Sequence, residues 1–417
     1  MNSDKDNIPP LLTQLIPAGH CTCATSTTFS CGGCLASISL NKPETTSPSK
    51  WTFQPDRDKN NIGLDQRKCE LSFPGLFEDV KRAVRFWEEG IPGEAVNTIK
   101  LSNGMAKARI QNGELYILEV RSAQNDHRRK ILAILSSIHR ALSAHPKPDS
   151  EKPWNFDFVF SVEDRVQDVG GRNHPIWVLG RKASEEAVWL IPDFGFWAWE
   201  NLSNSLGPYS EVVERINTNE LGLGWDSKTP KLVWRGKLSF APKLRRGLLD
   251  AARNKPWGDV KELIWSRKDN FISMEDHCKY MFIAHVEGRS FSSSLKYRQA
   301  CRSVIVAHKL QYIQHHHYLL QADGPYQNFV EVERDFSDLS TKIEALLQDP
   351  EKAKQIADNS VATFQQRYLT KAAEACYWRA LWNGWANVSA PATTGEKGLR
   401  YESFILLESS AMMQGTW

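Results

Sequence analysis

The sequence predicts an α/β protein in which two Rossmann-like domains face a cleft. Its 417 residues are enough for two domains of ordinary size, each with its own core. Within residues 277–308, two apolar runs of strand length, 280–286 and 303–307, flank a Glu-Gly break and a segment of helical spacing at 292–301. The order strand, turn, helix, strand predicts a βαβ unit and therefore a parallel sheet.

Composition excludes two classes of protein. A formal net charge of +3 is small for this length, so there is no electrostatic case for a nucleic-acid partner. No apolar run approaches the roughly 20 residues of a membrane span. The first residues do not resemble a signal peptide either, so we expect any membrane anchor to lie outside this chain.

The cysteines are unevenly placed. Four of them fall within a Ser/Thr/Gly-rich segment, namely Cys21, Cys23, Cys31 and Cys34. They either bind zinc or form two disulfides, and the narrow first pair favours disulfides. The other four are scattered, and the sequence leaves their pairing open: Cys69, Cys278, Cys301 and Cys376. Asparagines 201 and 387 begin acceptor sequons that fit a secretory route.

The first 72 residues read as an extended Cys/Ser/Thr-rich arm, and an N-terminal, acceptor-side domain is expected over residues 73–207. Apolar spacing predicts helices at 76–89 and 126–144 and strands at 114–120, 156–162, 176–179 and 188–191.

Two groups in this domain are candidates for chemistry. Asp164 comes just after the strand at 156–162, where α/β enzymes place catalytic groups, although such a residue also serves as a turn or cap. The segment containing Asp193, Phe194 and Trp197 combines one acid with several rings. It either walls a sugar site or packs in the core.

The second domain is expected over residues 208–348, beginning with a polar linker or hinge at 208–229. A strand at 231–234 leads through Arg235, Gly236 and Lys237 into a helix at 242–254, whose first turns carry Lys243, Arg245 and Arg246. Cations at a helix start oppose the helix dipole unless an anion lies between them, which favours a bound phosphate.

The turn after the strand at 280–286 repeats this pattern. It offers hydroxyls and positive charge from Arg289, Ser290, Phe291, Ser292, Ser293, Ser294 and Lys296. A helix cap is the alternative for the serines. Neither a P-loop nor GxGxxG is present, so triphosphate hydrolysis and hydride transfer lose support. Two phosphate-binding turns and an acid at a strand end are the layout of a nucleotide-sugar transferase.

No metal site is predicted. Three consecutive histidines, 315–317, cannot all face one ion from a helix or strand, and no Asp-x-Asp pair occurs. A strand at 328–332 and a helix at 335–347 complete the second domain. The helices of residues 349–390 are expected to pack back across both domains, and the tail 391–417 has no assignment.

Several motifs together resemble glycosyltransferase family 90, which includes fungal capsule-associated proteins and animal protein O-glucosyltransferases. They are Trp-Arg-Gly at 234–236, Lys-Tyr at 279–280, Gly-x-Ser-x-Ser at 288–292, Leu-Lys-Tyr at 295–297, Asn-Phe-Val at 328–330 and Ile-Ala-x-Asn at 356–359. Their order along residues 73–385 is more specific than any one of them.

The resemblance implies a GT-B fold, a UDP-sugar donor carrying xylose or glucose, inversion at the anomeric carbon, and no required cofactor. It implies that Asp164 is the general base on the hydroxyl of a glycan or protein acceptor. Diphosphate contacts map onto Lys237, Arg245 or Arg246, and onto residues 289–294. This chain has Ser294 where the animal enzymes have arginine, so Arg289, Lys296 or Arg298 must supply that charge.

The leading hypothesis is therefore an inverting UDP-sugar glycosyltransferase of fungal secretory type, in the lumen of the Golgi or endoplasmic reticulum. A retaining enzyme is disfavoured only by the resemblance. A carbohydrate- or nucleotide-binding pseudoenzyme of the same fold is the rival, because of Ser294. A nuclear or cytosolic binding protein is the third alternative.

Overall fold

The computed structural model describes residues 51–123, 125–146, 153–166, 174–200, 205–264, 266, 270–392 and 398–413. The chain divides into two compact units. Of the described residues, unit 1 contains those within 211–369, 182–184 and 51–53, and unit 2 contains those within 54–181, 185–210 and 370–413. The cysteines at 21–34 lie outside the described residues, so the choice between zinc and disulfides there stays open.

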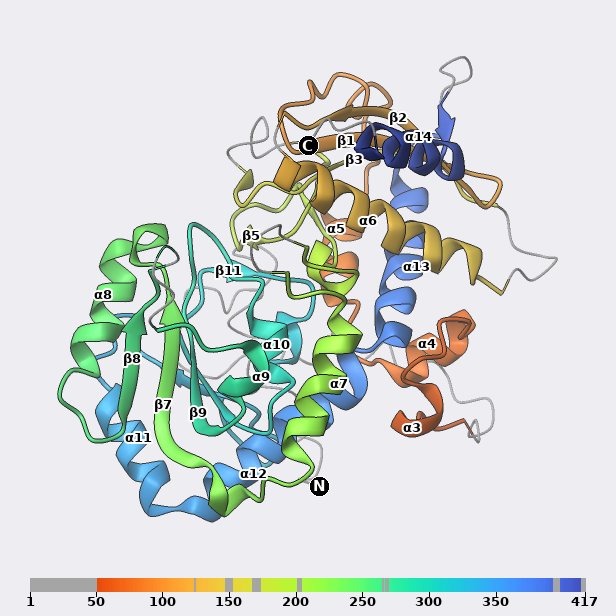
Figure 1. Ribbon diagram of the computed structural model, residues 1–417. Coiled ribbons are helices and arrows are strands. Elements are labelled where there is room, and N and C mark those ends of the chain that lie inside the picture. The colour runs from red at the N-terminus through yellow and green to blue at the C-terminus, as the bar shows by residue number, and fades with distance from the viewer. Residues whose placement is uncertain are drawn as a thin grey trace. The chain divides into compact units, whose positions relative to one another are not determined.

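Unit 1 is built on a sheet in which every neighbouring pair of strands is parallel. Its strands are β7 (Thr229–Gly236), β8 (Gly258–Glu262), β9 (Tyr280–His285), β10 (Val304–His308) and β12 (Val330–Val332). Their spatial order is β12-β10-β9-β7-β8, so the chain passes from β7 to β8 on one side and then returns to place β9 on the other (Figure 1). The order of strands therefore reverses between β7 and β9.

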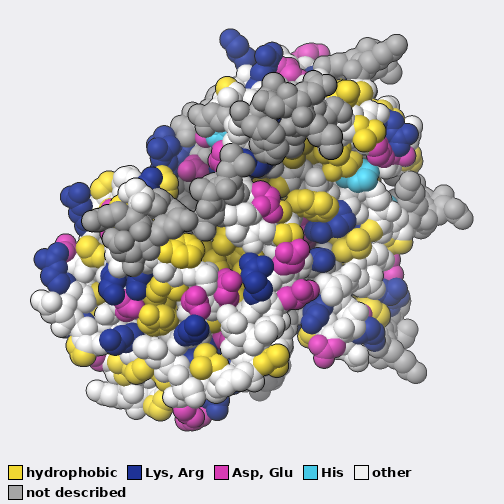
Figure 2. Space-filling view, in the orientation of Figure 1, with side chains coloured by type: hydrophobic (Ala, Val, Ile, Leu, Met, Phe, Trp, Pro, Cys, Tyr) yellow, Lys and Arg dark blue, Asp and Glu magenta, His cyan; other side chains and the backbone are white. Residues whose placement is uncertain are grey.

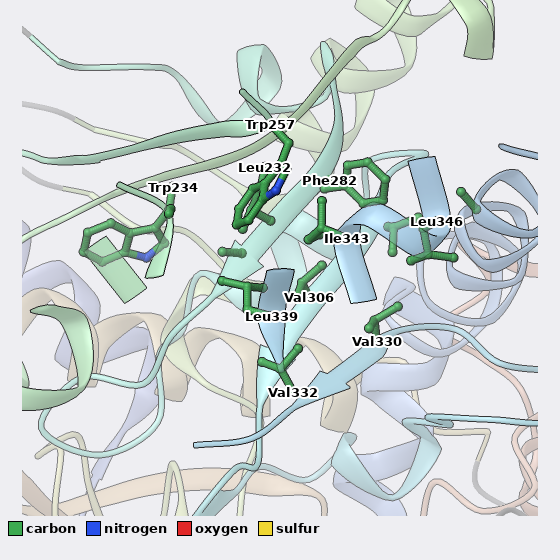
Figure 3. Close-up of a cluster of buried hydrophobic side chains, with 14 of the residues drawn as sticks. Leu232, Trp234, Trp257, Phe282, Val306, Val330, Val332, Leu339, Ile343 and Leu346 are labelled. Atoms are coloured by element: carbon green, nitrogen blue, oxygen red, sulfur yellow. The ribbon is translucent and has the colours of Figure 1, made fainter. Parts of the chain in front are cut away.

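The core of unit 1 lies where alternate strand residues meet three helices, α8 (Pro242–Ala251), α11 (Leu339–Gln348) and α12 (Pro350–Ser360). Register places Leu232 beside Phe282 and Phe282 beside Val304, so these side chains share one face of the sheet. Figure 3 shows Leu232, Phe282 and Val306 from the strands beside Ile343 and Leu346 of α11. This buried apolar layer fixes the register of the sheet.

Unit 1 contains further short elements: α7 (Tyr209–Glu220), η4 (Trp225–Ser227), η5 (Leu238–Phe240), α9 (Met274–His277), α10 (Leu295–Gln299), β11 (Tyr312–Ile313), η6 (His317–Leu319) and a π-helical segment, η7 (Val361–Tyr368). A disulfide joins Cys278, just before β9, to Cys301, just before β10. The linker expected over 208–229 is wrong, because α7 is a helix whose Val212 and Ile216 are fully buried.

Unit 2 contains a mixed sheet with the order β13-β2-β1-β3-β4-β6. Its strands are β1 (Met105–Gln111), β2 (Glu114–Arg121), β3 (Asn155–Ser161), β4 (Trp177–Val178), β6 (Trp189–Leu190) and β13 (Leu399–Arg400), and β5 (Arg181–Lys182) lies outside it. Only β3, β4 and β6 pair in parallel, while β1 forms a hairpin with β2 through Asn112-Gly113, both at positive φ. The expectation of a Rossmann-like first domain is therefore wrong for the β1–β2 half of this sheet.

The helices of unit 2 are α3 (Pro55–Asp58), α4 (Gln66–Ser72), α5 (Glu78–Phe86), α6 (Asn125–Ser143), η3 (Phe194–Phe196), α13 (Lys371–Val388) and α14 (Tyr401–Met413). Helix α13 supplies three fully buried tryptophans to the core, Trp378, Trp382 and Trp385. A disulfide joins Cys69 of α4 to Cys376 of α13.

The arm expected over residues 1–72 is wrong for residues 55–72, since α3 and α4 belong to unit 2, and residues 1–50 lie outside the described part of the chain. The helices expected to form one C-terminal segment are divided, with α12 in unit 1 and α13 in unit 2. The unassigned tail contains β13 and α14, which contact β2.

Positive and negative side chains are interspersed over the face shown in Figure 2, without a field of one sign. Within the described part of the chain, none of the helices is both long and apolar enough to cross a membrane.

Candidate functional site

The carboxyl ends of β7 and β9 form the switch point of the unit 1 sheet. In open α/β sheets, ligands bind in the crevice outside the strand ends at the point where strand order reverses. The two turns predicted to bind phosphate, after Gly236 and after His285, leave these two neighbouring strands. The structure therefore brings both predicted turns to one edge of one sheet.

Trp234 and Gly236 explain the end of β7. A Cβ atom on Gly236 would lie 2.5 Å from the Trp234 ring, so only glycine accommodates this ring. The ring is buried, and the guanidinium of Arg245 lies 5.6 Å from its centroid. The Trp-x-Gly sequence thus packs the strand end against the first turns of α8.

The Arg235 side chain pairs with the neighbouring strand β8 and not with the turn that follows β7. Its guanidinium donates to both carboxylate oxygens of Asp259 on β8, at 2.9 and 3.0 Å, and the hydroxyl of Tyr280 donates to the same carboxylate at 2.7 Å. Burial alone would raise the pKa of Asp259, but these hydrogen bonds, with one from Lys261, lower it to about 2. This pairing argues against Arg235 as a direct diphosphate contact.

Arg245 is the buried cation of the site. It donates to the carbonyl of Lys237 at 2.5 Å and to the carbonyl of Glu287 at 3.1 Å, so one guanidinium joins the two turns. Burial lowers its pKa to about 10, which leaves it charged at neutral pH. Gly288 lies beside this guanidinium, since a Cβ there would lie 3.4 Å from the Arg245 Nη2 atom.

The turn after β9 carries hydroxyls at several depths. Ser290 is buried, and its Oγ has no hydrogen-bond partner among the described residues. The Oγ atoms of Ser292 and Ser294 lie 2.9 Å apart, and the Lys296 ammonium donates to the carbonyl of Ser293 at 2.9 Å. A buried hydroxyl without a partner is costly, so Ser290 is suited to a ligand oxygen.

The remaining candidates of this site differ in exposure. Lys237, Arg246 and Arg289 are exposed, Ser293 is half-buried, and Phe291, Ser294 and Lys296 are buried. The exposed cations can reach an anion without first breaking an ion pair to a carboxylate of the described residues.

Glu287 was not predicted, although it holds the turn in place. Its carboxylate accepts from the backbone N–H groups of Gln311 and Tyr312, both at 2.8 Å, and from Arg334 at 2.8 Å. The residue is 1% exposed, and burial raises its pKa against the opposing effect of Arg334. One carboxylate thus ties together segments that follow β9, β10 and β12.

Asp164 belongs to unit 2, where it follows β3 and is exposed. The backbone before it is fixed, because the N–H of Val162 donates to Gly104 and that of Glu163 to the hydroxyl of Ser161. The Glu163 carboxylate lies 3.5 Å from the His127 ring. An exposed carboxylate on a fixed strand end can accept a proton from a bound hydroxyl.

The aromatic segment has a packing role in unit 2. Asp193 is 2% exposed and caps η3 by accepting from the N–H of Gly195 at 2.8 Å. Phe194 is buried against Trp199, and Trp197 is half-buried beneath the guanidinium of Arg140 at 4.7 Å. These contacts favour the packing alternative for Asp193 and Phe194, and the assignment of Asp193, Phe194 and Trp197 to a sugar site stays a prediction.

The three histidines at 315–317 are buried in unit 1. Burial lowers the pKa of His317 to about 3 and that of His316 well below its usual value, so both rings are neutral. Among the described residues, no cluster of His, Cys, Asp or Glu is arranged to hold a metal ion.

Comparison with known proteins decides the family. The sequence profile of glycosyl transferase family 90 matches residues 66–402, which is most of the chain. The chain belongs to glycosyltransferase family 90. The match covers both turns at the switch point, the buried Arg245 and the exposed Asp164.

Three relatives are similar to this family 90 chain. Human protein O-glucosyltransferase 1 is 21% identical over 58% of this chain and 65% of its own length. The rumi homolog of Aedes aegypti is 24% identical over 46% and 51%, and protein O-glucosyltransferase 2 of Danio rerio is 28% identical over 39% and 34%. The chain thus spans less than two thirds of the length of each.

Among solved structures, Anabaena HepE in complex with UDP and glucose matches 37% of this chain and 48% of its own, at 16% identity and a TM-score of 0.26. A likeness this slight carries no argument about the fold.

Proposed function

We propose that this protein is an inverting glycosyltransferase of the GT-B type that moves glucose or xylose from a UDP-sugar to a hydroxyl of a glycan or protein. Unit 1 binds the donor and Asp164 of unit 2 is the general base. Membership in family 90 and the names of the related O-glucosyltransferases support the activity.

The main support for a donor site in unit 1 is the set of cations at the switch point of its sheet. Lys237, Arg245 and Arg289 have no carboxylate partner among the described residues. Unpaired cations at the strand ends of a parallel sheet, beside the partnerless hydroxyl of Ser290, suit a diphosphate. Arg289 can supply the charge that Ser294 does not.

The chemistry follows from these groups. The Asp164 carboxylate takes the proton of the acceptor hydroxyl, whose oxygen attacks the anomeric carbon from the face opposite the diphosphate. The bond from that carbon to the β-phosphate oxygen breaks, and its electron pair leaves with UDP. Cations placed where negative charge grows stabilise the transition state more than the ground state. No cofactor is needed for these steps.

We propose a secretory lumen as the location, and two disulfides support it. Disulfides such as Cys69–Cys376 and Cys278–Cys301 are typical of an oxidising compartment and rare in the cytosol. The sequon residue Asn387 is exposed in the last turn of α13, while Asn201 lies outside the described residues. Mapping of both disulfides by non-reducing peptide mass spectrometry on protein from its native host tests this location.

The activity is tested by UDP release from UDP-glucose, UDP-xylose, UDP-galactose and UDP-glucuronate, with mannan oligosaccharides as acceptors. We expect release with one donor and a loss of about 10³-fold in Asp164→Asn, with UDP affinity unchanged, because the base acts only on the acceptor. Unchanged turnover in this variant excludes Asp164 as the base. UDP binding without turnover of any donor would favour the pseudoenzyme.

A further inference from the structure

An exposed aromatic ring lies at the switch point of unit 1. Phe240 ends the short helical turn η5 between β7 and α8, and 44% of its surface is exposed. Three cations surround its ring centroid: the Lys237 ammonium at 5.5 Å, the Arg245 guanidinium at 5.6 Å and the Arg289 guanidinium at 5.9 Å. They come from the end of β7, from α8 and from the turn after β9.

This arrangement is not explained by packing. A single exposed Phe is ordinary in a folded protein, but three like charges around one ring repel one another. No carboxylate among the described residues neutralises them. The negative face of an aromatic ring attracts a cation within about 6 Å, so the ring offsets part of the repulsion.

The two turns meet at the same ring. A Cβ atom on Gly288 would lie 3.8 Å from the Phe240 Cβ and 3.4 Å from the Arg245 Nη2 atom. Phe240 therefore contacts the region where the chain after β9 approaches the chain after β7. A side chain at this place can control how closely the three cations gather.

We propose that Phe240 is a positioning residue for the donor diphosphate: its ring holds Lys237, Arg245 and Arg289 together while no anion is bound. The inference rests on the proposed function, because it takes the diphosphate of a UDP-sugar as the ligand. When the diphosphate binds, it replaces the ring as the main counter-charge, and the cations need little rearrangement. Preorganisation of this kind improves affinity by lowering the cost of ordering the site.

Aromatic character, and not volume, is the property that this role requires. Phe240→Leu keeps an apolar side chain of similar size but removes the ring quadrupole, so Lys237 and Arg289 move away from Arg245, which its two carbonyl acceptors still hold. We expect UDP affinity to fall about 5-fold, which corresponds to the loss of one or two cation–π contacts. Phe240→Tyr keeps the ring and is expected to retain affinity within about 2-fold.

The experiment is calorimetric titration of the folded chain with UDP and with UMP. The loss in Phe240→Leu is expected to be smaller for UMP, which brings less charge to the cations. Tyr326→Leu is the matched control, because Tyr326 is an exposed ring of unit 1 at 65% exposure with no cation over it among the described residues. It should leave both affinities unchanged.

The outcomes separate the two proposals. If the wild-type protein does not bind UDP, the proposed function fails. If wild-type protein binds UDP and Phe240→Leu binds it equally well, the positioning role fails while the donor site stands. Equal losses in the Leu and Tyr variants would also overturn it, since the cause would then be packing. Thermal unfolding of each variant tests whether the substitution has altered folding.

Discussion

Glu287 shows how a single side chain can organise a site that it does not itself form. Its two oxygens accept from two backbone N–H groups and from Arg334, and its own N–H donates to the Nε2 atom of His308 at 3.1 Å. The residue directly precedes Gly288, whose place near Arg245 depends on this anchor. The stability of the turn and its affinity for an anion are therefore linked.

We expect Glu287→Gln to lower the free energy of unfolding by about 2 kcal/mol. The neutral amide no longer neutralises Arg334, and its NH₂ group cannot accept the hydrogen bonds that the second carboxylate oxygen accepts. Urea denaturation measures the change. The control is Glu333→Gln, which breaks an exposed ion pair with Lys309 and should cost less than about 0.5 kcal/mol. Equal effects in the two variants would contradict the anchoring role.

At the scale of single residues, the sequence predicted where turns occur but not which side chains form hydrogen bonds or ion pairs with one another. The strand end before Asp164 and the turns at 236 and 288 could be predicted because each follows an apolar run of strand length. Arg235 could not be excluded, because its partner Asp259 lies on a strand that the sequence did not reveal. Glu287 was treated as a break, because its partner Arg334 is remote in sequence and no local pattern joins them.

At the scale of elements, helices α13 and α5 of unit 2 approach each other closely at Gly384. A Cβ atom on Gly384 of α13 would lie 2.7 Å from a methyl carbon of Val80 and 3.0 Å from one of Val84. Both valines belong to α5. Glycine is thus required by the approach of the helices and not by backbone conformation.

Gly384→Ala should therefore destabilise the protein by about 2 kcal/mol through overpacking, although the same change in an exposed helix stabilises by about 1 kcal/mol. Thermal unfolding gives the sign directly. Adding Val80→Ala should recover part of the loss, which a double-mutant cycle would detect. A stabilising effect of Gly384→Ala alone would show that the helices can separate at no cost.

Two elements of the structure, strand β1 and helix α7, were not predicted from the sequence pattern. Strand β1 was missed because Lys107 and Arg109 interrupt its apolar pattern, yet both are buried, and Arg109 pairs with Asp157 of β3 at 2.6 Å. Helix α7 looked like a linker because its buried side chains are few among polar ones. Both elements depend on partners remote in sequence, whereas β7, β9 and β10 each contain an unbroken apolar run, residues 232–234, 280–284 and 304–307, and were predicted.

For the molecule as a whole, acid stability should be set by the buried histidines of unit 1. Burial lowers the pKa of His277 and His308 to about 4 and that of His317 to about 3. His308 shows why: its Nε2 accepts from the N–H of Glu287 while its Nδ1 lies 2.9 Å from the carbonyl of Lys309, which suits only a neutral ring. A proton on Nε2 would break this arrangement.

The sign of this pH dependence follows from the difference in proton binding between the unfolded and the folded protein. Unfolded histidine binds a proton near pH 6.5, whereas these folded rings do not, so stability falls as pH drops from 6.5 to about 4. Each ring contributes at most about 1.4 kcal/mol per pH unit in this window. Asp259 cannot be the cause, because its lowered pKa acts only below the usual 3.8, and the raised pKa of Glu287 acts in the opposite direction.

Urea midpoints measured from neutral pH to about pH 4.5 should therefore decrease steadily. The decisive variant is His317→Gln, which removes one titrating ring: its slope against pH should be shallower by up to about 1.4 kcal/mol per pH unit, even if its stability at neutral pH is lower. The slope of the free energy of unfolding against pH gives the number of protons taken up on unfolding, whereas a loss of packing lowers the free energy equally at every pH. A loss of packing therefore cannot produce the shallower slope. A flat profile in the wild-type protein would mean that the histidines become protonated without unfolding, so that unit 1 admits water around them.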